Sequence, residues 1–302
     1  MPLVPAVPPA PPKPKAYQPG ERIDIELVKG GAKMTFAYIP PGKFLMGSPE
    51  SEKDRDSDET QHSVTLTRGF YMGVHPVTQA QYEAVTGTNP SQFKGDTLPV
   101  ESVSWEDAVK FCNALSKKEG KTPCYMEGTW TTVPGADGYR LSTEADWEYA
   151  SRGMTTEEYL KLESEGKPTP PFYWGGELNG TQANCNGSNP YGTAATDPPR
   201  YLGKTSPVGN YADKAPKKHP WGLCDVHGNV WEWCADWYDA AYYASSPKDD
   251  PTGAEDGSLR VGRGGCWDNG AWYCRSAYRG RGTPDVRYSY FGFRLAVVPS
   301  GQ

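Results

Sequence analysis

The segment from residue 261 to residue 298 constrains the fold more than any other part of the chain. Its arginines recur beside acidic and polar neighbours such as Asp285, in a stretch with few aliphatic residues. We therefore expect buried or half-buried ion pairs, and hydrogen bonds from guanidinium groups to backbone carbonyls, which fix a loop without a hydrophobic core. The arginines concerned are Arg275, Arg279, Arg281, Arg287 and Arg294.

The residues between these arginines have the composition of a binding surface. Tyrosine gives a large contact area at low entropic cost, and Ser, Gly and Asn supply adaptable hydrogen bonds, as in antibody-type surfaces. The positions of this kind are Asp268, Asn269, Gly270, Tyr273, Tyr278, Gly280, Gly282, Tyr288, Ser289 and Tyr290. The segment therefore predicts a binding surface laid over a stiff frame, with exposed tyrosines as the main contacts.

Glycine and proline set the class of fold. The 34 Gly and 29 Pro predict that loops outweigh regular elements, which excludes a helical bundle, while the 12% aromatic content argues against disorder. Alternating residues predict strands within 23–38, 62–66, 70–74, 229–233, 258–262 and 293–298. The expected class is α+β.

Three helices are predicted by capping residues. Each N-cap is followed by a helical run and a closing glycine, in the pairs Thr78 and Gly87, Ser104 and Gly120, and Thr143 and Gly153. A further helical segment is expected at 155–165. Residues 49–61 are expected to form a solvated charged loop. Residues 166–220 predict long irregular loops, which usually need a metal or a function to hold them.

Charge and hydropathy exclude several kinds of partner. The net charge is −6 and no basic stripe occurs, so nucleic acid is not expected to bind. No apolar run reaches the roughly 18 residues of a membrane helix. Residues 1–20 form a proline-rich tail or linker without the apolar region of a signal peptide, which favours the cytoplasm. A leader removed upstream would leave display at the cell surface open.

The cysteines and histidines do not predict a zinc site. The seven Cys include no CxxC pair, and the four His are scattered. An odd number of cysteines at irregular spacing is typical of reduced, buried thiols rather than of a disulfide framework.

Six ordered blocks resemble the formylglycine-generating enzyme family, also called sulfatase-modifying factors. The blocks are GKFLMGS (42–48), HPVTQAQYEAV (75–85), LPVESVSWEDAVKFCNAL (98–115), YRLSTEADWEYASRG (139–153), WGLCDVHGNVWEWCADWY (221–238) and RGGCW…CRSAYRGRGTPD…FGFRLA (263–296). The resemblance implies a C-type lectin-like α+β fold that is loop-rich, with a small twisted antiparallel sheet and flanking helices. It implies one such domain over residues 21–302.

The resemblance does not carry over the family's catalytic cysteines. The enzymes of the family bind copper with two cysteines five residues apart, and counting back from Pro284 places Cys266 and Ala271 at those positions. A copper(I) bis-thiolate needs two convergent soft ligands, so we expect neither copper nor oxidase activity. The alternative is a divergent oxidase or protein-modifying enzyme that uses Cys266. A metal or redox pair of Cys266 with Cys274 also stays open.

Within the family, the chain looks most like a variable protein of a diversity-generating retroelement. In such systems, adenines of a template repeat are mutagenised and the copy overwrites the end of the gene that encodes residues ending in GFRLA. We therefore predict a non-catalytic protein that binds an unidentified protein or other surface ligand through region 261–298. The predicted ligand-binding positions are Cys266, Asp268, Asn269, Gly270, Tyr273, Tyr278, Gly280, Gly282, Val286, Tyr288, Ser289 and Tyr290. An ordinary non-catalytic member with a tyrosine-rich end is the alternative.

Residues 225–232 resemble the family's calcium-binding segment. The resemblance implies a structural calcium ion held by the side chains of Asp225 and Glu232 and by the carbonyls of Gly228 and Val230. Calcium prefers such a mixture of carboxylate and carbonyl oxygens. The alternative is that Asp225 and Glu232 pair with arginines and that no metal binds.

Overall fold

A computed structural model describes residues 17–29 and 31–299. Most of the predicted tail, residues 1–16, lies outside the described residues. Tyr17, in the described end of the predicted tail 1–20, packs onto the strands that follow, because its ring stacks on Tyr38 with centroids 4.9 Å apart. The Gly20 N–H also donates to the Tyr38 carbonyl.

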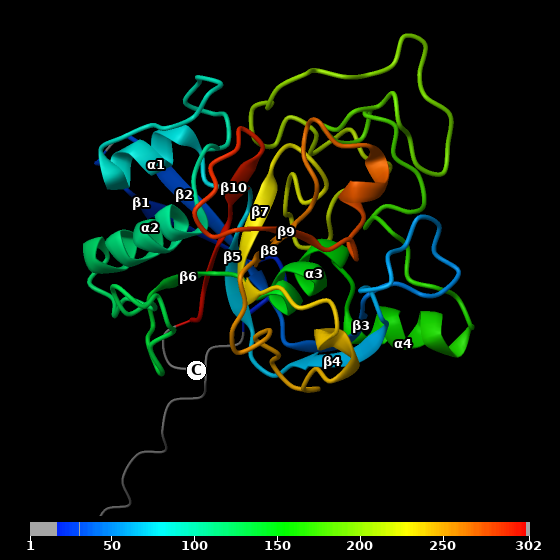
Figure 1. Cartoon of the computed structure of the whole chain (residues 1–302), viewed down its shortest axis with the longest axis horizontal. Helices are drawn as coiled ribbons and strands as arrows, with labels where there is room; N and C mark the ends of the chain where they lie inside the picture. The colour runs from blue at the N-terminus through cyan, green and yellow to red at the C-terminus, as the bar shows by residue number, and fades with distance from the viewer. Residues whose placement is uncertain (1–16, 30, 300–302) are drawn as a thin grey trace, which may run out of the picture.

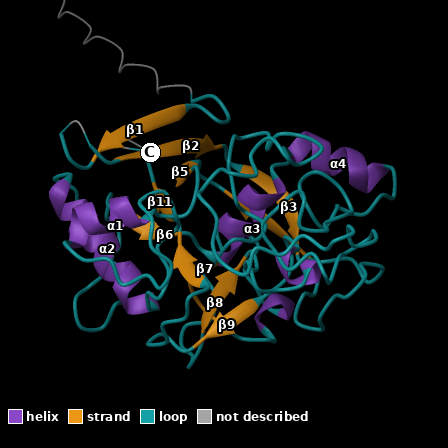
Figure 2. Cartoon of the chain, turned by 90° about the horizontal axis from the view of Figure 1, so that it is seen from above, coloured by secondary structure: helices purple, strands orange, loops and turns teal. Residues whose placement is uncertain are grey.

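The largest sheet is antiparallel and has the strand order β1-β2-β5-β11-β6. Its strands are β1 (Arg22–Glu26), β2 (Lys33–Ile39), β5 (Phe70–Gly73), β11 (Leu295–Val297) and β6 (Tyr139–Leu141). In Figure 1 the red C-terminal segment passes beside β6, and Figure 2 labels the last strand of the chain, β11, close to β5 and β6. The C-terminal segment is therefore anchored within this sheet.

A second sheet has the order β10-β7-β8-β9 and supports the C-terminal loops. It consists of β7 (Trp231–Trp237), β8 (Arg260–Arg263), β9 (Gly280–Gly282) and β10 (Phe291–Phe293). Strands β10 and β7 run parallel, which differs from the purely antiparallel sheet that we expected. Strand β10 leads through Arg294 directly into β11 of the other sheet. Strands β3 (Gly42–Met46) and β4 (His62–Leu66) form a separate hairpin.

The helices begin and end where the capping residues predict. They are α1 (Gln79–Thr86), α2 (Trp105–Lys118), α3 (Glu144–Arg152) and α4 (Thr156–Ser164). Each N-cap threonine or serine accepts a hydrogen bond from the third residue of its helix, and that residue bonds back. Two short 3₁₀ turns, η1 (Tyr242–Ala244) and η2 (Ala271–Cys274), complete the elements. In Figure 2, α1 and α2 lie side by side, away from α3 and α4.

Two hydrophobic clusters cover the two faces of the five-stranded sheet. On β2, Phe36 belongs to the cluster with α1 and α2, whereas the next residue, Ala37, belongs to the cluster with α3 and the β3–β4 hairpin. Successive strand residues point to opposite faces, so the central strands are buried on both sides. The fold therefore has helices on one face and a helix with a hairpin on the other.

The long loops between α4 and β7 are held by side chains. Phe172, Leu178 and Tyr191 form a small buried cluster with Ala271 and Cys274 of the C-terminal segment. At the far end of these loops, buried His219 contacts the Ala150 carbonyl at the end of α3 through Nε2. Its Nδ1 accepts from the N–H groups of Trp221 and Leu223, so the proton lies on Nε2.

Acidification should weaken the anchor at His219. Burial lowers the pKa of His219 to about 3, well below its usual 6.5. The unfolded chain therefore takes up the proton first, and stability is lost as pH falls below 6.5. At pH 5 the loss from this group is about 2 kcal/mol. Urea unfolding at pH 7 and pH 5 should show a smaller decrease for His219→Gln than for the wild type. Equal decreases would contradict this assignment.

Within residues 17–29 and 31–299, no helix is both long enough and apolar enough to cross a membrane.

Candidate functional site

A pocket of about 390 Å³ opens beside the second sheet and gathers most of the predicted binding positions. The predicted residues that line it are Cys266, Asp268, Asn269, Tyr278, Gly280, Tyr288 and Tyr290. They come from the loop after β8, from β9 and from the turn before β10. The segment therefore folds back on itself around one depression.

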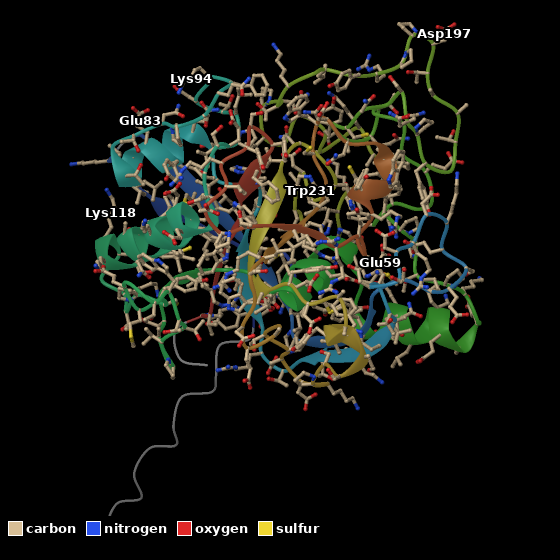
Figure 3. The ribbon with its side chains drawn as sticks, in the orientation of Figure 1. Glu59, Glu83, Lys94, Lys118, Asp197 and Trp231 are labelled. Atoms are coloured by element: carbon tan, nitrogen blue, oxygen red, sulfur yellow. The ribbon has the colours of Figure 1, made fainter. Side chains whose placement is uncertain are left out.

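Five further residues line the pocket that the sequence did not predict as binding positions, although Arg279 and Arg281 were predicted as part of the frame. They are Asp56, Trp231, Arg279, Arg281 and Phe291. Trp231 lies near the middle of the view in Figure 3, at the start of β7. Its position in a WEW motif among buried strand residues gave no sign of a pocket. Asp56 belongs to the charged stretch 49–61.

Aromatic rings form one continuous wall of the pocket. Tyr288 stacks on Tyr290 with centroids 5.0 Å apart, and Tyr290 lies 5.8 Å from Phe291. Phe291 lies 6.2 Å from Trp231, which lies 5.9 Å from Tyr278. Tyr288 is 46% exposed, whereas Trp231 is buried. We call these five residues the aromatic wall.

Glycines on β9 allow the indole rings to lie flat against the sheet. A Cβ at Gly280 would lie 2.6 Å from the ring of Trp231, and one at Gly282 would lie 2.8 Å from the ring of Trp233. In the loop before η2, a Cβ at Gly270 would meet the ring of Trp272 at 2.4 Å. A side chain at any of the three positions needs the neighbouring indole to move.

Five of the predicted positions do not line the pocket. Gly270 and Gly282 lie against tryptophan rings, as described above. The side chain of Val286 lies close to Gly282, since a Cβ added at Gly282 would be 3.4 Å from Cγ2 of Val286. Tyr273 packs behind the aromatic wall, with its centroid 4.7 Å from that of Tyr278. Ser289 contributes its carbonyl, which accepts from the indole N–H of Trp267.

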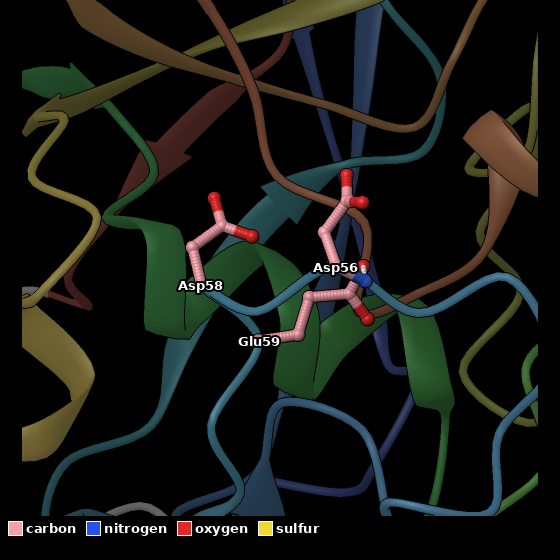
Figure 4. A group of neighbouring side chains, drawn as sticks. All are labelled: Asp56, Asp58 and Glu59. Carbon is pink, nitrogen blue, oxygen red and sulfur yellow. Dashed lines mark hydrogen bonds between the residues drawn. The ribbon is translucent and has the colours of Figure 1, made fainter.

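Two carboxylates from different segments line the pocket, those of Asp56 and Asp268. Asp56 lies in the same loop as Asp58 and Glu59, and one oxygen of each of these three carboxyl groups lies within 4.8 Å of the others (Figure 4). Burial, followed by the charges of Asp58 and Glu59, raises the pKa of Asp56. In the C-terminal segment, Asp268 accepts a hydrogen bond of 2.5 Å from the hydroxyl of Tyr201. This bond raises the pKa of Tyr201 to about 12.

Three arginines form the buried frame that the sequence predicts. Arg275 donates to Glu59 at 2.7 and 2.8 Å, and to Glu52 at 2.6 Å. Arg279 binds both carboxylate oxygens of Glu144 at 2.8 and 3.0 Å. Arg294 donates to the carbonyls of Gly73, Val74 and Cys224 as well as to Glu232. None of the three guanidinium groups is exposed.

Two other arginines differ from the buried arrangement. Arg281 is half-exposed and donates to the hydroxyl of Tyr238. Arg287 is also half-exposed and pairs with Asp107 of α2 rather than with the side chain of Asp285. Arg281 lies between two half-buried glycines, and Arg287 lies between half-buried Val286 and exposed Tyr288.

The expectation that residues 49–61 are a solvated loop is wrong for the residues that face the frame. Glu59 is fully buried and Asp58 nearly so, and Glu52 shares the guanidinium of Arg275. The charged stretch therefore supplies counter-ions to a segment more than 200 positions further along the chain.

Arg263 is a further frame arginine that the sequence did not predict. It is buried, pairs with Glu148 and donates to the carbonyls of residues 276–278.

Cys266 lies in the pocket lining as a buried thiol, and Ala271 is fully buried at the position of the second family cysteine. The Cys266 thiol donates to Oδ1 of Asn269 at 3.1 Å. Burial raises the pKa of Cys266 to about 12, so the nucleophilic thiolate is scarce at neutral pH. Cys274 makes its side-chain hydrogen bond with Cys185 of the long loop.

Thiol labelling should separate an inert Cys266 from a reactive one. All seven cysteines are free, and Cys224 is the one that is not buried among them. We expect iodoacetamide at pH 7.5 to label Cys224 first in the folded protein and to leave Cys266 unlabelled. In denaturant, all the cysteines should react. Mass spectrometry of peptides checks both results, and fast labelling of Cys266 in the folded protein would contradict this expectation.

The residues of the calcium prediction only partly suit a metal site. Both oxygens of Glu232 accept from Arg294, at 2.7 and 2.8 Å, and one also accepts from the indole N–H of Trp147. Glu232 does not fit as a ligand in this arrangement, because a guanidinium already neutralises it; this is the ion pair that the sequence left open. Asp225 is half-buried, and its Oδ2 accepts from the Gly209 N–H at 2.6 Å.

Calcium binding at Asp225, Gly228 and Val230 stays a prediction. The expected result is a Tm that rises with calcium concentration in protein first treated with EGTA, because an ion that binds the native state stabilises it. An unchanged Tm would argue against the site, and magnesium at the same concentration is the control.

The fold and the pocket together define a scaffold of the formylglycine-generating-enzyme type that carries a tyrosine-rich pocket on its C-terminal segment. Residues 28–298 match the family described as the sulfatase-modifying factor enzyme 1-like domain, and the chain belongs to this family. The predicted α+β, C-type lectin-like fold is confirmed.

Three relatives illustrate the range of the family. The chaperone protein LppX of Paenibacillus barcinonensis is 32% identical over 276 residues, which are 85% of this chain and 83% of that protein. A formylglycine-generating enzyme of Streptomyces coelicolor is 38% identical over 66% of this chain, which spans only 52% of the enzyme. The solved structure of Treponema denticola variable protein 1 is 28% identical, with a TM-score of 0.74 over 92% of this chain and 99% of that one.

Proposed function

We propose that this chain is a non-catalytic ligand-binding protein, the variable protein of a diversity-generating retroelement. The observation that carries the proposal is the convergence of seven predicted variable positions on one pocket. The predicted frame residues Arg275 and Arg294 are buried outside its lining, and Arg279 lines it with its guanidinium bound to Glu144. The similarity to Treponema denticola variable protein 1 supports the same function. The ligand is a protein or another surface molecule that contacts region 261–298.

The physical arrangement suits a surface that changes while the fold persists. The frame is held by charged hydrogen bonds to carbonyls and carboxylates, and of the arginines Arg275, Arg279 and Arg294 only Arg279 also lines the pocket. The exposed tyrosines supply contact area for affinity. Substitution at Tyr288 or Asp268 therefore changes the pocket without removing a frame contact.

The DNA that flanks the gene tests this proposal. We expect a near-copy of the codons for residues 264–296 that differs only at adenines, beside a gene for a reverse transcriptase. The differences should fall at the twelve predicted positions, and the codons of Trp267 and Trp272 should match as internal controls. If no such copy exists, the protein is an ordinary non-catalytic member of the family.

An enzyme that uses Cys266 is the second candidate, because Cys266 lines the same pocket and some relatives are formylglycine-generating enzymes. Its high pKa and the alanine at position 271 favour the binding function. Cys266→Ser separates the two functions. A modifying activity that this variant loses while it keeps its fold would support the enzyme, and full ligand binding by the same variant would support the binding protein.

A further inference from the structure

We infer that the pocket takes a cationic side chain, an arginine or lysine of the bound partner, between the aromatic wall and two carboxylates. This inference rests on the proposed function, since it names the chemistry of the ligand at the same site. Three features of the pocket carry it: aromatic faces, the charges that remain unpaired around it, and its size.

The aromatic wall offers ring faces to a cation. An ammonium or guanidinium group over the face of tryptophan or tyrosine is attracted by the quadrupole of the ring, and the attraction is stronger where water is excluded. Within the wall, Trp231 lies between Phe291 and Tyr278 and is 6% exposed, whereas Tyr288 at one end of the wall is 46% exposed. A long basic side chain can lay its methylene groups along Tyr288 and Tyr290 and bring its charge to the pocket.

The carboxylates at the pocket have no basic partner of their own. Among the described residues, neither Asp56 nor Asp268 lies within 4.0 Å of a basic group. The negative charges of Asp58 and Glu59 act on Asp56 more strongly than the positive charges of Arg275 and Arg281. Two carboxylates on different segments of the lining therefore attract a cation that enters between them.

The arginines of the lining are already engaged. Arg279 is fully buried against Glu144, and both its Nε and Nη2 are taken by that carboxylate. Arg281 lies 3.9 Å from Asp58, donates to the hydroxyl of Tyr238, and stands over the ring of Tyr238 at 4.5 Å. An anionic or purely apolar ligand would instead have to bury Asp56 and Asp268 without a counter-charge, which is unfavourable.

The volume fits one side chain rather than a large ligand. A pocket of about 390 Å³ lies at the low end of the range for bound small molecules. It accommodates one arginine or lysine side chain, and the rest of the partner would contact the exposed rim.

Titration with three small probes tests the inference. The probes are N-acetyl-arginine amide, the neutral N-acetyl-citrulline amide of nearly the same shape, and the anionic N-acetyl-glutamate amide. We expect the arginine probe to bind at least about tenfold more tightly than the other two, with an affinity that falls as salt is added. The readout is the indole N–H signal of Trp231 by NMR, assigned with Trp231→Phe.

Matched variants locate the selectivity. Asp268→Asn should weaken binding of the arginine probe about fivefold to tenfold and leave the citrulline probe unchanged, because it removes charge and keeps shape. Asp285→Asn is the control, since Asp285 is exposed in the same segment and lies outside the pocket. Tyr288→Ala should weaken both probes, and an unchanged Tm shows that the variant is folded.

The outcomes separate this inference from the proposed function. Equal binding of the arginine and citrulline probes, no binding of any probe, or an Asp268→Asn variant that keeps its selectivity would each overturn the cation inference. In those cases an adenine-mutagenised copy of codons 264–296 would still support the proposed function. Selective binding of the arginine probe, without such a copy beside the gene, would support the cation inference and contradict the proposal that the segment is diversified.

Discussion

Replacing Arg275 by methionine should lower the free energy of unfolding by about 3–5 kcal/mol, because it leaves buried carboxylates without their cation. Glu59 and Glu52 both hydrogen bond to Arg275, and no other salt bridge of theirs occurs among the described residues. Burial alone would raise the pKa of Glu59, but the hydrogen bonds and charge of Arg275 outweigh it and lower the pKa below 4.5. The stability that the Glu59–Arg275 pair contributes is present above pH 4.5 and is lost as pH falls further.

Arg287→Met is the matched control for Arg275→Met. It changes the same residue type in the same segment, but Arg287 is half-exposed and its partner Asp107 lies at the surface of α2. Exposed pairs contribute about 0–1 kcal/mol. Urea unfolding at pH 7 measures both variants, and the difference between Arg275→Met and the wild type should shrink below pH 4.5. Equal effects of the two substitutions would show that the frame does not depend on buried charge.

Gly265→Ala should destabilise the protein by about 2–4 kcal/mol, from a left-handed backbone and from crowding. Gly265 has φ +70°, and a Cβ there would lie 2.6 Å from Sγ of Cys274 and 3.0 Å from the backbone of Tyr273. The sulfur is buried and cannot swing away. The loop after β8 would therefore shift together with η2.

Gly120→Ala isolates the backbone contribution to that effect. Gly120 has φ +67°, and an added Cβ there meets no atom within 4 Å. We expect this control to cost only about 1 kcal/mol, the conformational part alone. Thermal unfolding of the two variants compares them directly. A Gly265→Ala variant no less stable than Gly120→Ala would show that the loop and η2 adjust freely.

Local signals predicted the helices, because a capping box is complete within four residues. Ser104 and Asp107 identify the start of α2, and both hydrogen bonds of the box form. The short strand β6 was missed, since three residues carry little alternation. Its pairing comes from β11, more than 150 positions away, and no local pattern contains that partner.

Of the candidate site, the sequence predicted only residues of the C-terminal segment 261–298. The tyrosines of 261–298 were selected by composition, and the structure gathers several of them at one pocket. Asp56 and Trp231 were not selected, because their approach depends on tertiary contacts. The stretch 49–61 has the composition of a solvated loop, but the guanidinium of Arg275, far along the chain, binds Glu52 and Glu59 inside the protein.

The passage from β10 to β11 determines which kinds of change the C-terminal segment tolerates. Phe291–Phe293 pairs with β7 in one sheet, and Leu295–Val297 lies between β5 and β6 in the other. One inserted residue here would turn every later side chain to the wrong face and displace Arg294 from Glu232. An engineer who builds a library on this scaffold can exchange Asp268 or Tyr288 at the pocket without removing a frame contact, but must keep the number of residues from 291 to 297 fixed.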